Sequence, residues 1–178
     1  MEAGSTVRIR IPVTSPVFGG AFSNTAEATP SETDNEELTP ETNISISNVQ
    51  VIAPTLIKSF NPIEIVVGQT STLTFTITNI SSNPSQNNIS FTDNLPFGLI
   101  LVDSPVWVSA NGCTATFLGA VGDPFVGVSN LTFPNGVSSC AFSVIVTSNT
   151  EGVFLNDNEN FSNQNNIDTS QALSLIHI

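Results

Sequence analysis

The chain has little positive charge and few polar aromatic residues. Its 178 residues include no tyrosine, one tryptophan and only three basic residues against 15 acidic ones, for a net charge of −12. Nucleic acids and anionic membrane surfaces are bound mainly through lysine and arginine, so the sequence disfavours both as partners. Sugar platforms and protein hot spots favour tryptophan and tyrosine, which counts against a carbohydrate-binding module.

The chain also lacks the residues that most enzyme centres need. It has one histidine, His177, and two cysteines, so it offers neither a cluster of soft metal ligands nor a histidine–nucleophile pair. Its acidic residues are scattered, without the paired carboxylates of a glycosidase. No apolar run reaches the length of about 18 residues that predicts a membrane span. We expect no enzymatic activity, no cofactor and no membrane insertion of this segment.

What the chain does have is alternation of apolar and polar residues. Residues 71–78 alternate serine or threonine with an apolar residue, which predicts a strand that buries Leu73, Phe75 and Ile77. Further strands are predicted at 55–60, 64–67, 88–93, 99–102, 106–109, 114–118, 128–133, 140–147 and 153–158. Short strands separated by turns rich in Gly, Pro, Asn and Ser predict an all-β fold, an immunoglobulin-like two-sheet β-sandwich.

A repeated phrase sets the domain organisation. Residues 13–27 are similar to residues 146–159 once a one-residue gap is allowed, so that Val13 aligns with Val146 and Glu27 with Glu159. Self-similarity over this distance is typical of an array with one whole domain per copy. We therefore expect residues 53–163 to form a complete repeat.

The segment before the complete repeat is predicted to be the C-terminal part of a preceding one. It covers residues 1–52, with strands at 7–13, 21–26 and 44–52 and an acidic insert at 28–42. After the complete repeat we expect a linker, or the start of a similar insert, at 164–172. The last six residues, 173–178, match what a common sequencing adapter encodes, so we expect them to be an artefact at the end of a metagenomic fragment.

Three segments carry a resemblance to a known family: residues 54–62, 68–79 and 91–99. Together they resemble the bacterial conserved surface repeat domain of unknown function, a tandem immunoglobulin-like repeat. The resemblance implies an exported spacer or stalk module in a large secreted or cell-surface adhesin-like protein, with no known catalytic residues. Its partners would be neighbouring repeats of the same polypeptide. The alternative is a module that binds a glycan or protein ligand through loops at one end of the sandwich.

Cys113 and Cys140 are the only cysteines, and each lies close to an Asn-Gly turn. An even count in an exported protein predicts a disulfide bond between them. Closing a loop of this size would stabilise the fold by roughly 3.5 kcal/mol on the chain-entropy model. The alternative is two free buried thiols.

Lys58 is the only basic residue of the complete repeat and lies on its first predicted strand. Two interpretations are open. In some surface sandwiches a lysine of this kind forms an isopeptide bond with Asn or Asp of a distant strand, which requires a buried lysine of lowered pKa and an adjacent carboxylic acid. The other interpretation is a surface lysine whose stem covers the edge of the core.

The run from Asn156 to Asn160 is rich in side-chain oxygens, the ligands that calcium prefers. Asp157 and Glu159 are its candidate calcium ligands, with Asp103 and Asp123 as further candidates. Alternate residues of a strand point to opposite faces, however, and the spacing lacks the pattern of a calcium loop. A solvated edge strand is the competing interpretation.

Overall fold

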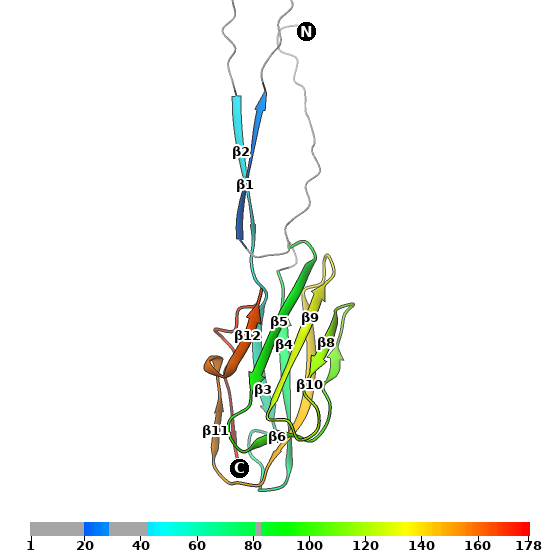
Figure 1. Ribbon diagram of the computed structural model, residues 1–178, viewed down its shortest axis with the longest axis vertical. Coiled ribbons are helices and arrows are strands. Elements are labelled where there is room, and N and C mark those ends of the chain that lie inside the picture. The colour runs from blue at the N-terminus through cyan, green and yellow to red at the C-terminus, as the bar shows by residue number, and fades with distance from the viewer. Residues whose placement is uncertain (1–19, 29–42, 81–82) are drawn as a thin grey trace, which may run out of the picture.

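The structure is a computed structural model that describes residues 20–28, 43–80 and 83–178. It confirms the predicted all-β, immunoglobulin-like class, because two antiparallel sheets pack face to face (Figure 1). In the part of the chain that the structure describes, the one helical element is the short 3₁₀ turn η1 (Asn158–Asn160). The described residues include no helix with the length and hydropathy of a membrane span.

Each sheet is built mainly from strands that the alternation predicted. The first contains β3 (Thr55–Asn61), β4 (Thr70–Thr78), β10 (Ser139–Ser148), β6 (Leu99–Leu101) and β7 (Val106–Ser109), of which β6 and β7 both pair with β10. The second has the order β12 (Phe161–Asn165), β5 (Gln86–Asn94), β9 (Phe125–Phe133), β8 (Thr114–Leu118).

Phenylalanine fills the space between the sheets. The predicted inward residues of β4, Leu73, Phe75 and Ile77, are fully buried. The Phe75 ring stacks on Phe142 of β10 with 4.8 Å between ring centroids and lies 5.9 Å from Phe91 of the opposite sheet. Since phenylalanine has no polar group to satisfy, these rings can be buried completely, and removing them from water is the main force that holds the sheets together.

Two predictions about strands differ from the structure. Residues 64–67 do not form a strand, because the chain turns at Gly68 with a φ of 81° and leaves Val66 and Val67 exposed. Conversely, β12 was not predicted. Its sequence, Phe-Ser-Asn-Gln-Asn, lacks β-branched residues, and it exists because it pairs with β5 and buries Phe161.

The sandwich also continues beyond residue 163. Strand β11 (Val153–Asn156) pairs with β13 (Ser174–His177), which lies in the segment expected to be foreign. The stretch predicted as a linker, 164–172, contains the end of β12 and the buried Ala172. Ile176 of β13 is fully buried in the main core. Residues after 165 therefore contribute to the packed structure.

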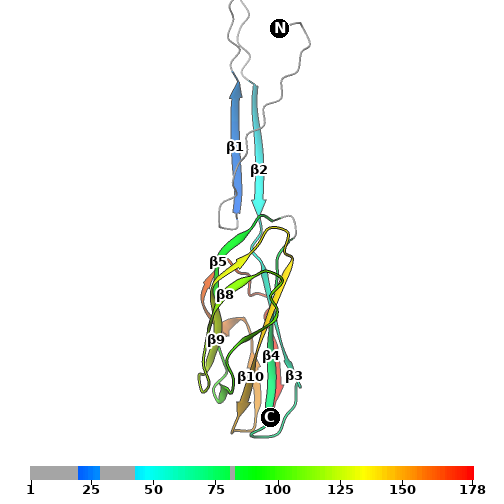
Figure 2. The same cartoon turned by 90° about the vertical axis from the view of Figure 1, so that its right-hand side faces the viewer.

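A two-stranded ribbon stands at one end of the sandwich (Figures 1 and 2). It consists of β1 (Gly20–Ala28) and β2 (Asn43–Val51), antiparallel, with Gly20 opposite Val51. The predicted strands at 21–26 and 44–52 correspond to this ribbon. The predicted strand at 7–13 and all but the first residue of the acidic insert at 28–42 lie outside the described residues.

Candidate functional site

Three polar side chains lie on inward positions of three different strands. Alternation along a strand sends every second residue to the same face, so each polar residue shares its face with buried apolar neighbours. These neighbours are Leu56 and Phe60 for Lys58 on β3, Phe91 and Leu95 for Asp93 on β5, and Phe154 for Asn156 on β11. The same alternation of inward and outward residues that builds the core therefore also places these three residues inside it.

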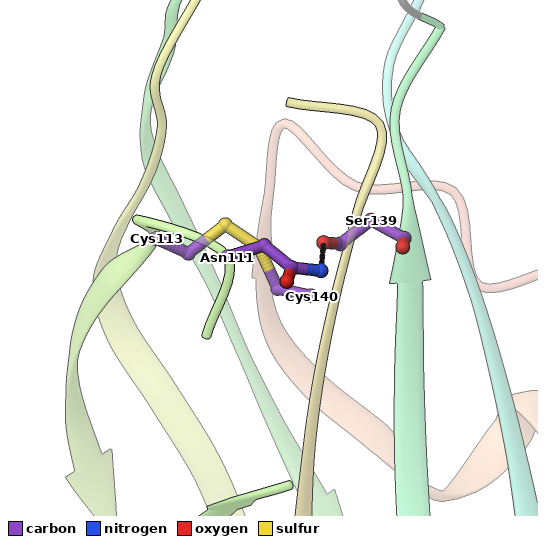
Figure 3. The surroundings of a disulfide bond; sticks show 4 residues. All are labelled: Asn111, Cys113, Ser139 and Cys140. Carbon is purple, nitrogen blue, oxygen red and sulfur yellow. Dashed lines mark hydrogen bonds between the residues drawn. A yellow bond between two sulfur atoms is a disulfide. The ribbon is translucent and has the colours of Figure 1, made fainter. Parts of the chain in front are cut away.

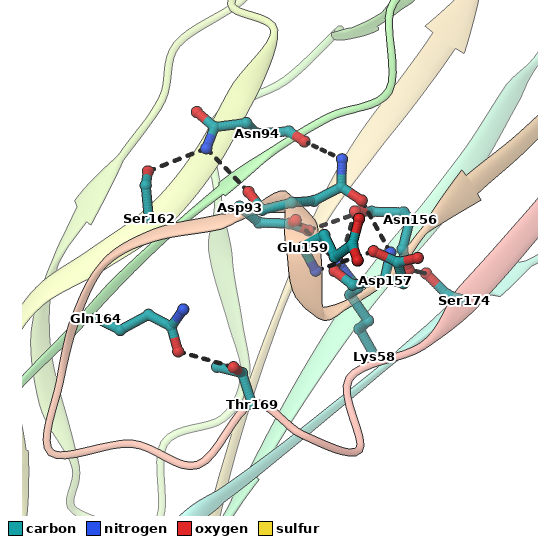
Figure 4. Close-up of polar contacts among 11 residues, drawn as sticks. Lys58, Asp93, Asn94, Asn156, Asp157, Glu159, Ser162, Gln164, Thr169 and Ser174 are labelled. Carbon is teal, nitrogen blue, oxygen red and sulfur yellow. Dashed lines mark hydrogen bonds and ion pairs between the residues drawn. The ribbon is translucent and has the colours of Figure 1, made fainter.

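The three side chains form a closed triangle of hydrogen bonds (Figure 4). Lys58 Nζ donates to Asp93 Oδ1 at 2.9 Å and to Asn156 Oδ1 at 2.7 Å. Asn156 Nδ2 in turn donates to Asp93 Oδ2 at 2.8 Å. The side chains of Lys58 and Asp93 are 0% exposed, and Asn156 is equally buried. Asp93 thus contacts both the amine and the amide nitrogen, while the amine contacts the amide oxygen.

A ring and a turn cover the triangle. The Phe161 ring centroid is 4.2 Å from Lys58 Nζ, and the carbonyl of Asp157 accepts a further bond from Nζ at 3.3 Å. The η1 turn is held on the end of β5 by reciprocal bonds between Asn94 and Asn160, at 2.9 and 3.0 Å. These contacts fix the geometry of the triangle and shield it from water.

Burial moves both titratable groups of the triangle toward their neutral forms. The pKa of Lys58 is lowered, because desolvation outweighs the opposing charges of Asp93 and Asp157. The pKa of Asp93 is raised, because desolvation outweighs the charge and hydrogen bond of Lys58. Both shifts make the neutral amine and the protonated carboxylic acid easier to reach than they are in water.

The family described as Domain of unknown function (DUF7933) matches residues 54–178. The chain belongs to this family. The matched stretch contains the whole Lys58–Asp93–Asn156 triangle and both cysteines. The resemblance of the DUF7933 domain to the bacterial surface repeat stays a prediction.

A crystal structure of BcpA, the major pilin subunit of Bacillus cereus, is similar to this chain with a TM-score of 0.43 and 12% identity. The similarity covers 86% of this chain and 55% of the pilin, so the chain spans about half of the pilin's length. None of the curated proteins compared matches the chain.

The interpretation of Lys58 as a surface lysine is wrong. The residue is only 5% exposed in the DUF7933 domain, because it lies on the inward face of β3 between the core residues Leu56 and Phe60. Neither partner was predicted. Asp93 was the last residue of the strand predicted at 88–93, and Asn156 belonged to the oxygen-rich run. Each lies two residues after a buried phenylalanine, and that spacing is the signal that predicts an inward position.

The two cysteines connect the two sheets of the DUF7933 domain. Cys113, just before β8, and Cys140, in β10, form a disulfide bond with 6.4 Å between their Cα atoms (Figure 3). Next to it, the Asn111 side chain donates to the carbonyl of Ser139 at 2.9 Å. The disulfide therefore crosses the sandwich from the residue before β8 of one sheet to β10 of the other.

The four candidate calcium ligands are not brought together. The carboxylates of Asp103, Asp123 and Asp157 accept bonds from nearby backbone amides of Ser104, Ala120 and Glu159, respectively. Glu159 is exposed on η1. The described residues contain no group of three or more His, Cys, Asp or Glu side chains that could hold a metal ion. In this structure the three aspartates shape turns.

Proposed function

We propose that the DUF7933 domain is a non-catalytic, extracellular structural module that carries tension along a bacterial surface or adhesin-type protein. One observation carries this proposal: the chain enters the sandwich from β2 at one end, and its C-terminal residue lies at the opposite end (Figures 1 and 2). Domains connected in this way add length to a stalk. Its partners would be neighbouring copies of the same polypeptide.

The strands at the two ends of the domain support a role under tension. The C-terminal segment runs parallel to the start of the sandwich, with bridges between Thr55 and Asp168 and between Glu64 and His177. Force applied at Val51 and Ile178 would pull these parallel segments past each other in shear. In that geometry the backbone hydrogen bonds between the two segments resist together, whereas peeling breaks them one at a time.

The composition and the disulfide bond are consistent with an exported location. A disulfide persists in an oxidising compartment, and Cys113–Cys140 ties the two sheets together. The net charge of −12 keeps neighbouring copies soluble by mutual repulsion.

Single-molecule pulling tests the proposed function. We expect the Asn156→Ala variant to unfold at a higher force when pulled at Val51 and Ile178 than when pulled at Val51 and Asn79. The second pair peels β3 from β4, beginning at Thr55 opposite Thr78. Equal or reversed forces would contradict the proposal. Specific capture by a glycan array would instead favour the ligand-binding alternative.

A further inference from the structure

We propose that the folded domain joins Lys58 to Asn156 in an isopeptide bond, with Asp93 as the catalytic acid–base residue. The proposal deepens the proposed function, on which it rests for its purpose, because the bond would tie the first strand of the sandwich to β11. It stands on the juxtaposition of an amine, an amide and a carboxyl group in one water-excluded site. This makes the triangle a self-modification site.

The reaction balances without any reagent from outside the triangle. The neutral Nζ of Lys58 attacks Cγ of Asn156, a C–N bond forms, and the bond from Cγ to Nδ2 breaks. One proton passes from Nζ to Asp93 Oδ1, and the carboxyl group delivers one proton from Oδ2 to the departing nitrogen. Nδ2 leaves as ammonia, and Asp93 ends in the protonation state in which it began. Nothing is oxidised or reduced.

The orientation of the amide distinguishes this site from an ordinary buried ion pair. An ion pair needs only Lys58 and Asp93, and such a pair is often no better for stability than apolar packing. Here Asn156 turns its carbonyl oxygen toward the amine and its leaving nitrogen toward the acid. Holding the reacting groups in contact removes most of the entropic barrier to amide exchange.

The segment predicted to be a preceding copy repeats the acceptor position. In the alignment that places Glu27 on Glu159, Asn24 falls on Asn156. Each asparagine also lies opposite a serine of its partner strand, Asn24 of β1 opposite Ser47 and Asn156 of β11 opposite Ser174. Lys58 is the only lysine in the sequence, and it contacts Asn156. Asn24 therefore supplies a matched control that shares the sequence context but not the bond.

Intact-mass measurement of the reduced full chain tests the proposal. We expect a mass below the sequence mass by one ammonia molecule in the wild type and in Asn24→Ala. Lys58→Met, Asn156→Ala and the nearly isosteric Asp93→Asn should each have the full mass of their sequences. A wild-type chain of full sequence mass would overturn the proposal.

A second measurement locates the loss. Cyclisation at Asn111-Gly112 or Asn135-Gly136 also releases ammonia, so a loss that persists in Lys58→Met would overturn the proposal. Digestion with an acid-specific protease should release the Lys58 peptide covalently linked to the Asn156 peptide from the wild type. Separate peptides from a wild type that has lost ammonia would equally contradict it. The intact mass and the digestion test only whether the isopeptide bond forms. The comparison of pulling directions uses Asn156→Ala, which cannot form the bond, and therefore tests the structural role separately.

Discussion

Lys58 Nζ lies 2.7 Å from Asn156 Oδ1, although the two residues are 98 positions apart in the chain. The contact connects β3, where the sandwich begins, to β11, and it encloses both cysteines in the segment between them. A covalent bond at this point would place most of the domain inside a closed loop.

Removing the acceptor should destabilise the domain. On the chain-entropy model, a cross-link that closes a loop of 98 residues stabilises the fold by about 4.7 kcal/mol. We expect Asn156→Ala to lose a free energy of unfolding of this order in urea denaturation. Asn24→Ala is the control, with an expected change within about 0.5 kcal/mol. Equal midpoints for the two variants would contradict the prediction.

The pH dependence of the bond-free protein should reflect the buried carboxyl group. Asp93 faces Lys58 and Asp157, and its pKa is raised by burial. Its contribution to stability is therefore fully present below about 3.8, the ordinary pKa of aspartate, and is lost as pH rises through the higher folded value. Urea midpoints of Asn156→Ala should fall over this range relative to those of Asn156→Ala/Asp93→Asn. Parallel profiles would show that Asp93 has no shifted pKa.

At alkaline pH the stability of the bond-free protein should change in the opposite direction. The pKa of Lys58 is lowered by burial, so the cost of burying the charged amine disappears as pH rises from the folded pKa toward 10.5. Stability of Asn156→Ala should therefore increase with pH in this window. Asn156→Ala/Lys58→Met, which has no amine at the site, should lack the increase, and an increase of equal size there would assign it to other groups.

The disulfide should stabilise the fold independently of the triangle. Cys113 and Cys140 are 27 residues apart, and opening a loop of this size should cost about 3.5 kcal/mol on the chain-entropy model. Urea denaturation of Cys113→Ser/Cys140→Ser measures the cost. Thiol labelling of oxidatively folded wild type should find no reactive thiol, and two readily labelled thiols would refute the bond.

Sequence alternation predicted most of the sandwich, because its strands are short and bury one face. It failed where pairing or turns decide the outcome. Phe161–Asn165 is a strand because β5 offers it an edge, and residues 64–67 are not a strand because the chain turns at Gly68. The apolar–polar pattern of a short segment shows neither the strand it pairs with nor the place where the chain turns.

The candidate site was predicted only in part. Lys58 stood out because it is the only lysine, but its two partners come from strands that are distant in the sequence. Alternation places Asp93 and Asn156 on inward faces without showing that those faces meet at one point. That meeting depends on how the sheets pack and on the η1 turn, which is fixed by the bonds between Asn94 and Asn160.

The packing of β13 can be tested, and this strand lies within residues 173–178, which the sequence predicted to be an artefact. Ile176 is fully buried against the core, whereas Leu175 is 38% exposed. Ile176→Ala should lower the free energy of unfolding by about 2 kcal/mol or more, as for other buried isoleucines, and Leu175→Ala should change it much less. Equal, small effects of the two substitutions would show that β13 does not pack as described.

The contour length released on unfolding tests the central claim most directly. The measurement pulls the reduced chain at Val51 and Ile178 until the domain unfolds. With a bond between Lys58 and Asn156, the 98 residue positions that separate them cannot extend. The wild type should therefore release roughly 330 Å less length than Asn156→Ala, at about 3.4 Å per residue. Equal lengths in the two proteins would contradict a covalently closed domain.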